Sequence, residues 1–285
     1  MERILVLATS AFVFISVGVA LVIINSAPDK PEGEPTAPPV VAAPEPQEAR
    51  SQAQPQEDAS PRSEASARNA LEDLVADAPE YQPFFKRLQE SFPAEYEAIL
   101  QAVKSKLDAS GTVQSVDFYV SDAIRLLRKS HGASVAKASP ERMERVFDAQ
   151  LAAMRAAASE DPRMCVGFLY GATAQDFEKM AASHRALIAE MAQARLEATA
   201  DGEAAHAERP APTEADVASL EKELSKRGLT NDELDVFLGG KIAQAGLDQS
   251  RMCVAGQSYL EALRALPLDV RMKIYSLLLE QMAHS

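Results

Sequence analysis

Two cysteines are the residues of this chain most capable of specific chemistry, and both stand in the same short sequence. Cys165 lies in residues 163–166 and Cys253 in residues 251–254, and each of these segments reads Arg-Met-Cys-Val. A pair of thiols can form a disulfide, hold a metal ion or exchange electrons with another protein. The chain has no other cysteine, so a specific chemical role is expected first at this pair.

The residues just before each copy predict that both cysteines lie in the first turn of a helix. Asp161 precedes the first copy and Ser250 the second, and both residue types favour the helix N-cap. A helix amino terminus and a neighbouring arginine both stabilise a thiolate, so a reactive or metal-binding pair is one interpretation. A second interpretation is that the two thiols are buried separately and form no bond with each other.

A structural disulfide is the interpretation that the spacing favours. Cys165 and Cys253 are 88 residues apart, whereas thiol-exchange enzymes generally place their two cysteines close together in sequence. In an exported domain, two cysteines ordinarily form a disulfide. Closing a loop of this length stabilises a fold by roughly 4 to 5 kcal/mol in the chain-entropy treatment, which is an upper figure.

The compartment is indicated by an uncharged apolar segment at residues 4–24. Its 21 residues, when helical, match a hydrocarbon core about 30 Å thick. We therefore predict that residues 1–24 form an uncleaved signal-anchor whose partner is the membrane. A cleaved secretory signal is the alternative: the sequence is compatible with cleavage after Ala20, whereas Pro28 obstructs cleavage after Ala27.

The polar region that follows the apolar segment predicts export. Arg3 and the terminal amine weakly favour an inside amino terminus. No cysteine lies near the end of the segment, so a lipidated signal is not expected. We predict a single-pass protein of the inner (cytoplasmic) membrane whose C-terminal domain is extracytoplasmic, in the periplasm.

Residues 25–68 have the composition of a disordered linker rich in proline, alanine and glutamate. They contain nine of the 17 prolines and neither an aromatic residue nor a leucine. Such a segment buries too little apolar surface to offset its ordering entropy. We predict a tether or plain spacer, and Pro-x-x-Pro spacing leaves a ligand for a proline-recognising groove as a second interpretation.

Residues 69–285 predict an all-α domain of about ten helices. Apolar side chains recur at three- and four-residue spacing, and no segment alternates with the two-residue period of a half-buried strand. The longest helix is expected from Thr173 to about residue 201, with His184 within its apolar stripe. Residues 201–212 form a polar segment and the expected position of any internal boundary.

Composition and spacing argue against several classes of function. The net charge of −13 disfavours a nucleic-acid binder, and no part of the chain is basic. The four histidines show no metal-type spacing, no phosphate-binding glycine loop or nucleophile elbow occurs, and no cofactor is expected. Eight methionines of the domain could fill its core or line an adaptable groove for a partner helix.

The layout of anchor, linker and exported helical domain is similar to that of membrane-tethered steric chaperones for secreted enzymes, although no motif carries residues across. It favours a domain that binds another protein, as scaffold, assembly factor or chaperone. Two alternatives stay open at this point. One is a cell-wall hydrolase with an unidentified acidic residue, and the other is a thiol oxidoreductase that uses Cys165 and Cys253.

Overall fold

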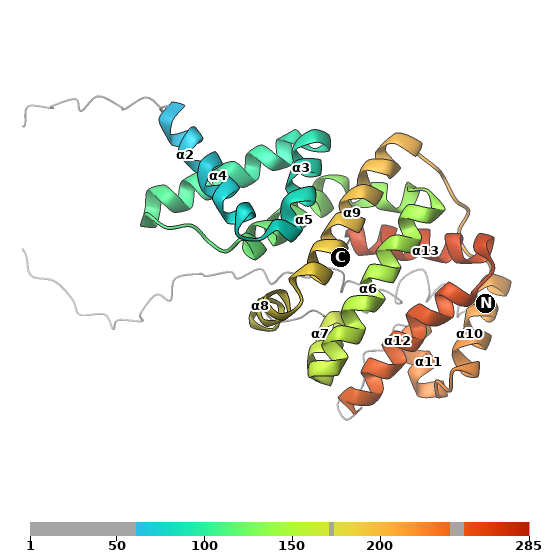
Figure 1. Ribbon diagram of the computed structural model, residues 1–285. Helices are drawn as coiled ribbons and strands as arrows, with labels where there is room; N and C mark the ends of the chain where they lie inside the picture. The colour runs from blue at the N-terminus through green and yellow to red at the C-terminus, as the bar shows by residue number, and fades with distance from the viewer. Residues whose placement is uncertain (1–60, 171–173, 240–247, 285) are drawn as a thin grey trace, which may run out of the picture.

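The computed structural model describes residues 61–170, 174–239 and 248–284, and this part of the chain is all-α, without strands (Figure 1). The helices are α2 (Pro61–Ala76), α3 (Gln82–Ser91), α4 (Pro93–Ser110), α5 (Val116–His131), α6 (Pro140–Glu160), α7 (Pro162–Tyr170), α8 (Ala174–Ser183), α9 (Arg185–Ala205), α10 (Glu214–Lys226), α11 (Asn231–Gly239), α12 (Gln249–Ala265) and α13 (Leu268–His284). Two 3-10 segments, η2 (Pro79–Tyr81) and η3 (Gly132–Lys137), join them. The predicted fold class is confirmed for these residues.

The predicted signal-anchor, residues 1–24, and most of the predicted linker lie outside the described residues. Within the described ranges, no helix has the length and apolarity that crossing a bilayer requires. Helix α2 begins at Pro61, so its first residues belong to the segment 25–68 that the composition predicts to be a linker. Ala67 is buried in the core, and Arg68 lies 3.4 Å from Glu97 of α4.

The first group of helices consists of α2 to α5. Helix α4 packs against α2, α3 and α5. Its buried face carries Ile99 and Val103, which meet Phe84 and Leu88 of α3 in one continuous core. Proline at the first turn of α4 and Gly111 after its end, at φ 68°, set the limits of this helix.

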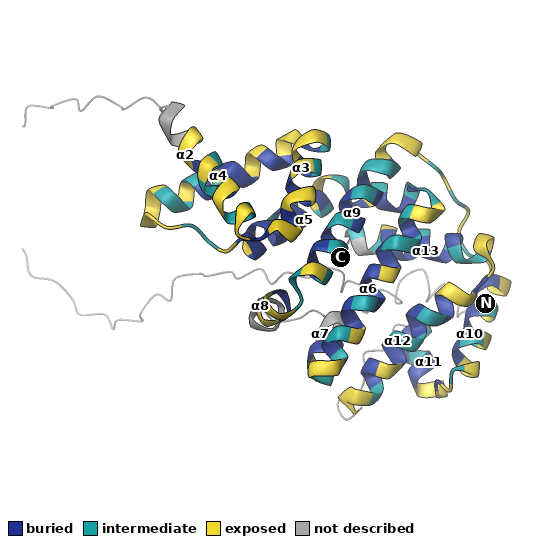
Figure 2. Ribbon diagram, viewed as in Figure 1, coloured by how far each residue is buried: buried dark blue, intermediate teal, exposed yellow. Residues whose placement is uncertain are grey.

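The second group surrounds α6 and α12. Helix α6 contacts α7, α9, α12 and α13, and α12 contacts α7, α10 and α13. The rings of Phe147 on α6 and Tyr275 on α13 stack with centroids 3.7 Å apart. Figure 2 shows that the buried residues of these helices face one another. Six methionines contribute to the core of the protein, which confirms core filling for these positions: Met143, Met154, Met164, Met180, Met252 and Met272.

Helix α9 connects the two groups. It packs on α3 and α5 of the first group and on α6 of the second (Figure 1). It also contacts η3. At Gly202 the backbone of η3 comes so close that a Cβ atom would lie 1.7 Å from the carbonyl oxygen of Ser134. A glycine is therefore required for this contact.

The prediction of one continuous helix from Thr173 to residue 201 is wrong, because the helix is interrupted at His184. This residue has φ −133° and ψ 40°, and it separates α8 from α9. Its Nε2 atom lies 2.7 Å from Glu160 at the end of α6. The regular spacing of apolar residues continues across the break, which is why the sequence pattern predicts one helix.

The segment after α9 is held against η3. Arg209 donates hydrogen bonds to the carbonyl oxygens of Ala136, over 3.0 Å, and Ala138, over 2.6 Å. The backbone amide of Ala207 donates to the carbonyl of Lys137 over 3.3 Å. The polar segment 201–212 therefore contributes contacts to the fold, and α9 extends into it as far as Ala205.

Candidate functional site

Cys165 and Cys253 form a disulfide that joins α7 to α12. Their Cα atoms are 5.6 Å apart, and their residues are 0% and 2% exposed. Helix α6 packs against both α7 and α12. The predicted pairing of the two cysteines is present, and it fixes the start of the C-terminal helical pair to the middle of the chain.

Aspartates begin both helices. Asp161 accepts a hydrogen bond from the backbone amide of Arg163 over 2.8 Å, just before α7. Asp248 is the N-cap of α12 and accepts from the amide of Ser250 over 3.2 Å. The prediction that Ser250 caps α12 is wrong, because Asp248 begins this helix two residues earlier. Cys253 is therefore the fifth residue of α12 and lies beyond its first turn.

Gln257 lies over the sulfur atoms. Its Nε2 atom is 3.1 Å from Sγ of Cys253, one helical turn earlier, and 3.9 Å from Sγ of Cys165. Thiol exchange requires an attacking thiolate to reach a sulfur atom. The burial of both cysteines and the position of Gln257 leave the sulfur atoms little access to such a thiolate, which favours a structural role.

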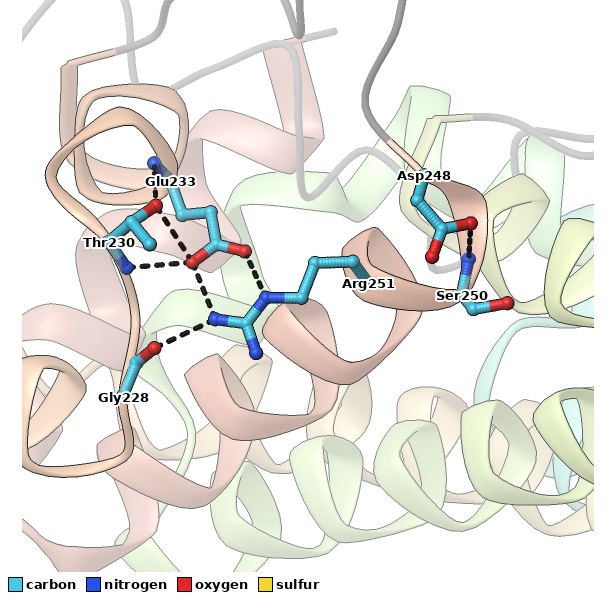
Figure 3. A network of polar contacts seen from close by, with 6 residues as sticks. All are labelled: Gly228, Thr230, Glu233, Asp248, Ser250 and Arg251. Atoms are coloured by element: carbon cyan, nitrogen blue, oxygen red, sulfur yellow. Dashed lines mark hydrogen bonds and ion pairs between the residues drawn. The ribbon is translucent and has the colours of Figure 1, made fainter.

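The two arginines of the repeated tetrapeptide have different surroundings. Arg163 is paired with Asp161 on its own turn, with Nε 3.0 Å from Oδ2, and its side chain is 76% exposed. Arg251 reaches instead to α11, where Nε lies 2.6 Å from Oε1 of Glu233 and Nη2 lies 2.8 Å from Oε2 (Figure 3). The cysteines of the two tetrapeptides thus bond to each other, whereas their arginines pair with different carboxylates, Asp161 and Glu233.

Glu233 is the centre of the polar network in Figure 3. Its carboxylate accepts hydrogen bonds from the amide and the hydroxyl of Thr230, over 2.7 and 3.0 Å. The backbone amide of Glu233 donates in turn to the hydroxyl of Thr230 over 3.3 Å, which completes a capping box at the start of α11. Nη2 of Arg251 also donates to the carbonyl oxygen of Gly228 over 2.7 Å. The network ties the beginning of α12 to the turn before α11.

Burial and these contacts together determine the pKa of Glu233. Burial of the side chain, which is 2% exposed, raises the pKa of Glu233. The hydrogen bonds from Arg251 and Thr230 outweigh this effect and hold the pKa below its ordinary value. A buried carboxylate that accepts from two partners is a structural anion rather than an available proton acceptor.

Three polar clusters between α5 and its neighbours could not be found from sequence spacing, because their members come from distant parts of the chain. In the first, the hydroxyl of buried Tyr81 donates to Asp117 of α5 over 2.6 Å. Arg185 of α9 lies 3.4 Å from the other carboxylate oxygen of Asp117. The second cluster consists of Arg128 and Arg195, which are considered further below.

The third cluster is centred on His131, the last residue of α5. Its two ring nitrogens each lie 3.0 Å from a carboxylate, Nε2 from Glu95 on α4 and Nδ1 from Glu203 on α9. Ser134 also donates to Glu203 over 2.6 Å, and the bonds from Ser134 and His131 hold the pKa of Glu203 below its ordinary value. The ring of Phe92 packs on His131 with centroids 4.8 Å apart.

In the described ranges, no group of three or more histidine, cysteine, aspartate or glutamate side chains has the arrangement of a metal site. His184 contacts Glu160, and His206 follows the end of α9 in the left-handed region, at φ 49°. Comparison with known proteins gives no further assignment: no family model, no curated protein and no solved structure matches this chain.

Proposed function

We propose that this protein is tethered to the inner membrane and that its helical domain lies outside the cytosol and binds another protein, as scaffold, assembly factor or chaperone. The observation that carries the proposal is the disulfide between Cys165 and Cys253. Protein disulfides persist in oxidising compartments and are rare in the cytosol.

The sequence before the folded part supports the same location. Residues 4–24 are uncharged and long enough to span a bilayer, and a proline-rich segment follows them. A tether of this composition lets a folded domain work at a distance from the membrane. The described helices begin directly after it, at Pro61.

Two exposed apolar side chains offer positions at which a protein partner can be detected. Phe118 on α5 is 48% exposed, and Val254 on α12 is 51% exposed. Val254 immediately follows the disulfide-bonded Cys253, so a partner that contacts it would sit beside the most constrained part of the fold. Aromatic residues are among the usual anchors of protein interfaces, whereas valine is under-represented there, so Phe118 is the stronger of the two positions.

Photo-crosslinking in intact cells tests the proposal. A photoreactive residue would replace Phe118 or Val254 in the full-length protein, and Glu90 on α3, which is also exposed, serves as the control position. We expect a discrete crosslinked protein at Phe118 or Val254 that is absent at Glu90. The absence of any such product at both apolar positions would count against protein binding, and release of soluble fragments from purified cell wall would support a hydrolase instead.

A further inference from the structure

Helices α5 and α9 lie side by side and run in the same direction. Asp117 near the start of α5 pairs with Arg185 at the start of α9. His131 at the end of α5 pairs with Glu203 near the end of α9. At both ends of this interface, a basic side chain, Arg185 or His131, therefore contacts a carboxylate.

Between these two ion pairs, each helix carries a further arginine. Arg128 lies between Asp117 and His131 along α5, and Arg195 lies between Arg185 and Glu203 along α9. Neither Arg128 nor Arg195 forms an ion pair or a side-chain hydrogen bond with any residue that the structure describes.

Arg195 is the more deeply placed of the two. It is 7% exposed, and its Nη2 atom is buried without a hydrogen-bond partner among the described residues. Burial, with a smaller contribution from the charge of Arg128, lowers the pKa of Arg195 to about 10. The guanidinium therefore remains protonated at neutral pH, and a buried charge without a counter-charge is strongly disfavoured.

Arg128 lies in the last turn of α5, where the helix dipole favours a positive charge. Helix α5 packs against α9, and the charge of Arg128 acts on the guanidinium of Arg195. Burial and the charge of Arg125 lower the pKa of Arg128. Arg125 itself is paired with Asp122, with Nε 3.0 Å from Oδ1, so its charge is compensated locally. The carboxylate of Asp122, six residues before Arg128, is thus already engaged by Arg125.

We propose that Arg128 and Arg195 together bind a small oxyanion of the phosphate class between α5 and α9. Guanidinium groups donate pairs of parallel hydrogen bonds to the oxygens of such an anion. Phosphate carries more than one negative charge at neutral pH and several acceptor oxygens, so one ion satisfies both arginines. This inference is independent of the proposed protein partner.

Thermal unfolding of the full-length protein tests the site. The protein would start in a mild detergent and a buffer that contains neither phosphate nor sulfate. Phosphate, sulfate or acetate would then be added in separate titrations, with chloride used to keep the ionic strength constant. At phosphate concentrations about ten times the dissociation constant, we expect the melting temperature to rise by about 3 to 6 °C. A rise with acetate and none with phosphate would overturn the assignment.

Three variants separate specific binding from the general stabilising effect of excluded salts. Arg128→Gln should weaken phosphate binding about tenfold or more. Arg195→Met should abolish the specific rise and, without phosphate, melt no lower than the parent protein, because it removes an uncompensated charge. Lys129→Gln, which removes an exposed cation from the next position of α5, should respond as the parent does. The proposal would be overturned if phosphate raised the melting temperature equally in the parent protein and in Arg128→Gln. It would also be overturned if phosphate raised the melting temperature of neither the parent protein nor any variant.

Discussion

Arg251 on α12 donates two hydrogen bonds to the buried carboxylate of Glu233 on α11, with Nε 2.6 Å from Oε1 and Nη2 2.8 Å from Oε2. The corresponding arginine of the first tetrapeptide, Arg163, turns back to Asp161 instead. The repeat of four residues therefore places two cysteines at related positions, and its second copy also connects α12 to α11.

The Glu233–Arg251 pair predicts an asymmetry between two substitutions. Arg251→Met leaves a carboxylate that is 2% exposed without its cation and should lower the free energy of unfolding by about 3 kcal/mol. Glu233→Gln keeps the capping box and leaves an arginine that is 42% exposed to water, so it should cost about 1 kcal/mol.

Urea unfolding measures both values. Arg155→Met, which breaks an exposed pair with Glu261, is the control and should change the free energy by less than about 1 kcal/mol. Equal losses for Arg251→Met and Glu233→Gln would contradict the assigned asymmetry.

The same carboxylate predicts a contribution to acid stability. The pKa of Glu233 is lower in the folded protein than its ordinary value, so the folded state binds its proton less tightly than the unfolded chain. Its stabilisation is fully present above the unfolded pKa, about 4.3, and is lost as the pH falls through the folded pKa. Plots of unfolding free energy against pH should therefore fall less steeply for Glu233→Gln below about pH 4.5, and parallel acid limbs would refute this assignment.

The disulfide predicts a large effect of removing both cysteines. The double change Cys165→Ala and Cys253→Ala opens a loop of 88 residues and should lower the free energy of unfolding by up to roughly 4 to 5 kcal/mol. Urea unfolding of this variant, compared with the oxidised parent, measures the loss. The variant should match the parent protein unfolded in the presence of a reductant, and a change below about 1 kcal/mol would contradict a stabilising role.

Gly202 predicts a local steric effect. A Cβ atom there would overlap the backbone of Ser134, so Gly202→Ala forces α9 and η3 apart and should destabilise the fold by about 3 kcal/mol or more. Gly111→Ala is the comparison: its φ of 68° carries a conformational cost of about 1 kcal/mol, but no atom lies within 4 Å of the new Cβ. Thermal melting of both variants should therefore rank Gly202→Ala well below Gly111→Ala.

The helical class of the described part could be predicted because it rests on local patterns, and the disulfide pairing could be predicted because the chain has only two cysteines. Apolar spacing marks the helices, and a threonine followed three positions later by an acidic residue is a local pattern that the structure shows as a capping box at Thr213 and at Thr230. The break at His184 could not be predicted, because the apolar period continues across it and its partner Glu160 lies 24 residues earlier in the chain. The burial of Arg195 without a counter-charge depends on how α9 packs against helices from other parts of the chain, which no spacing in the sequence reports.

The redox state of the two cysteines in intact cells tests the proposed location most directly. Cells that make the full-length protein would be quenched in acid and treated with a thiol-reactive reagent under denaturing conditions, with and without prior reduction. We predict that Cys165 and Cys253 are labelled only after reduction, and that a variant lacking residues 4–24 accumulates with both thiols free. Labelling of both cysteines in the full-length protein without reduction would contradict an oxidising compartment and, with it, the proposed extracytoplasmic domain.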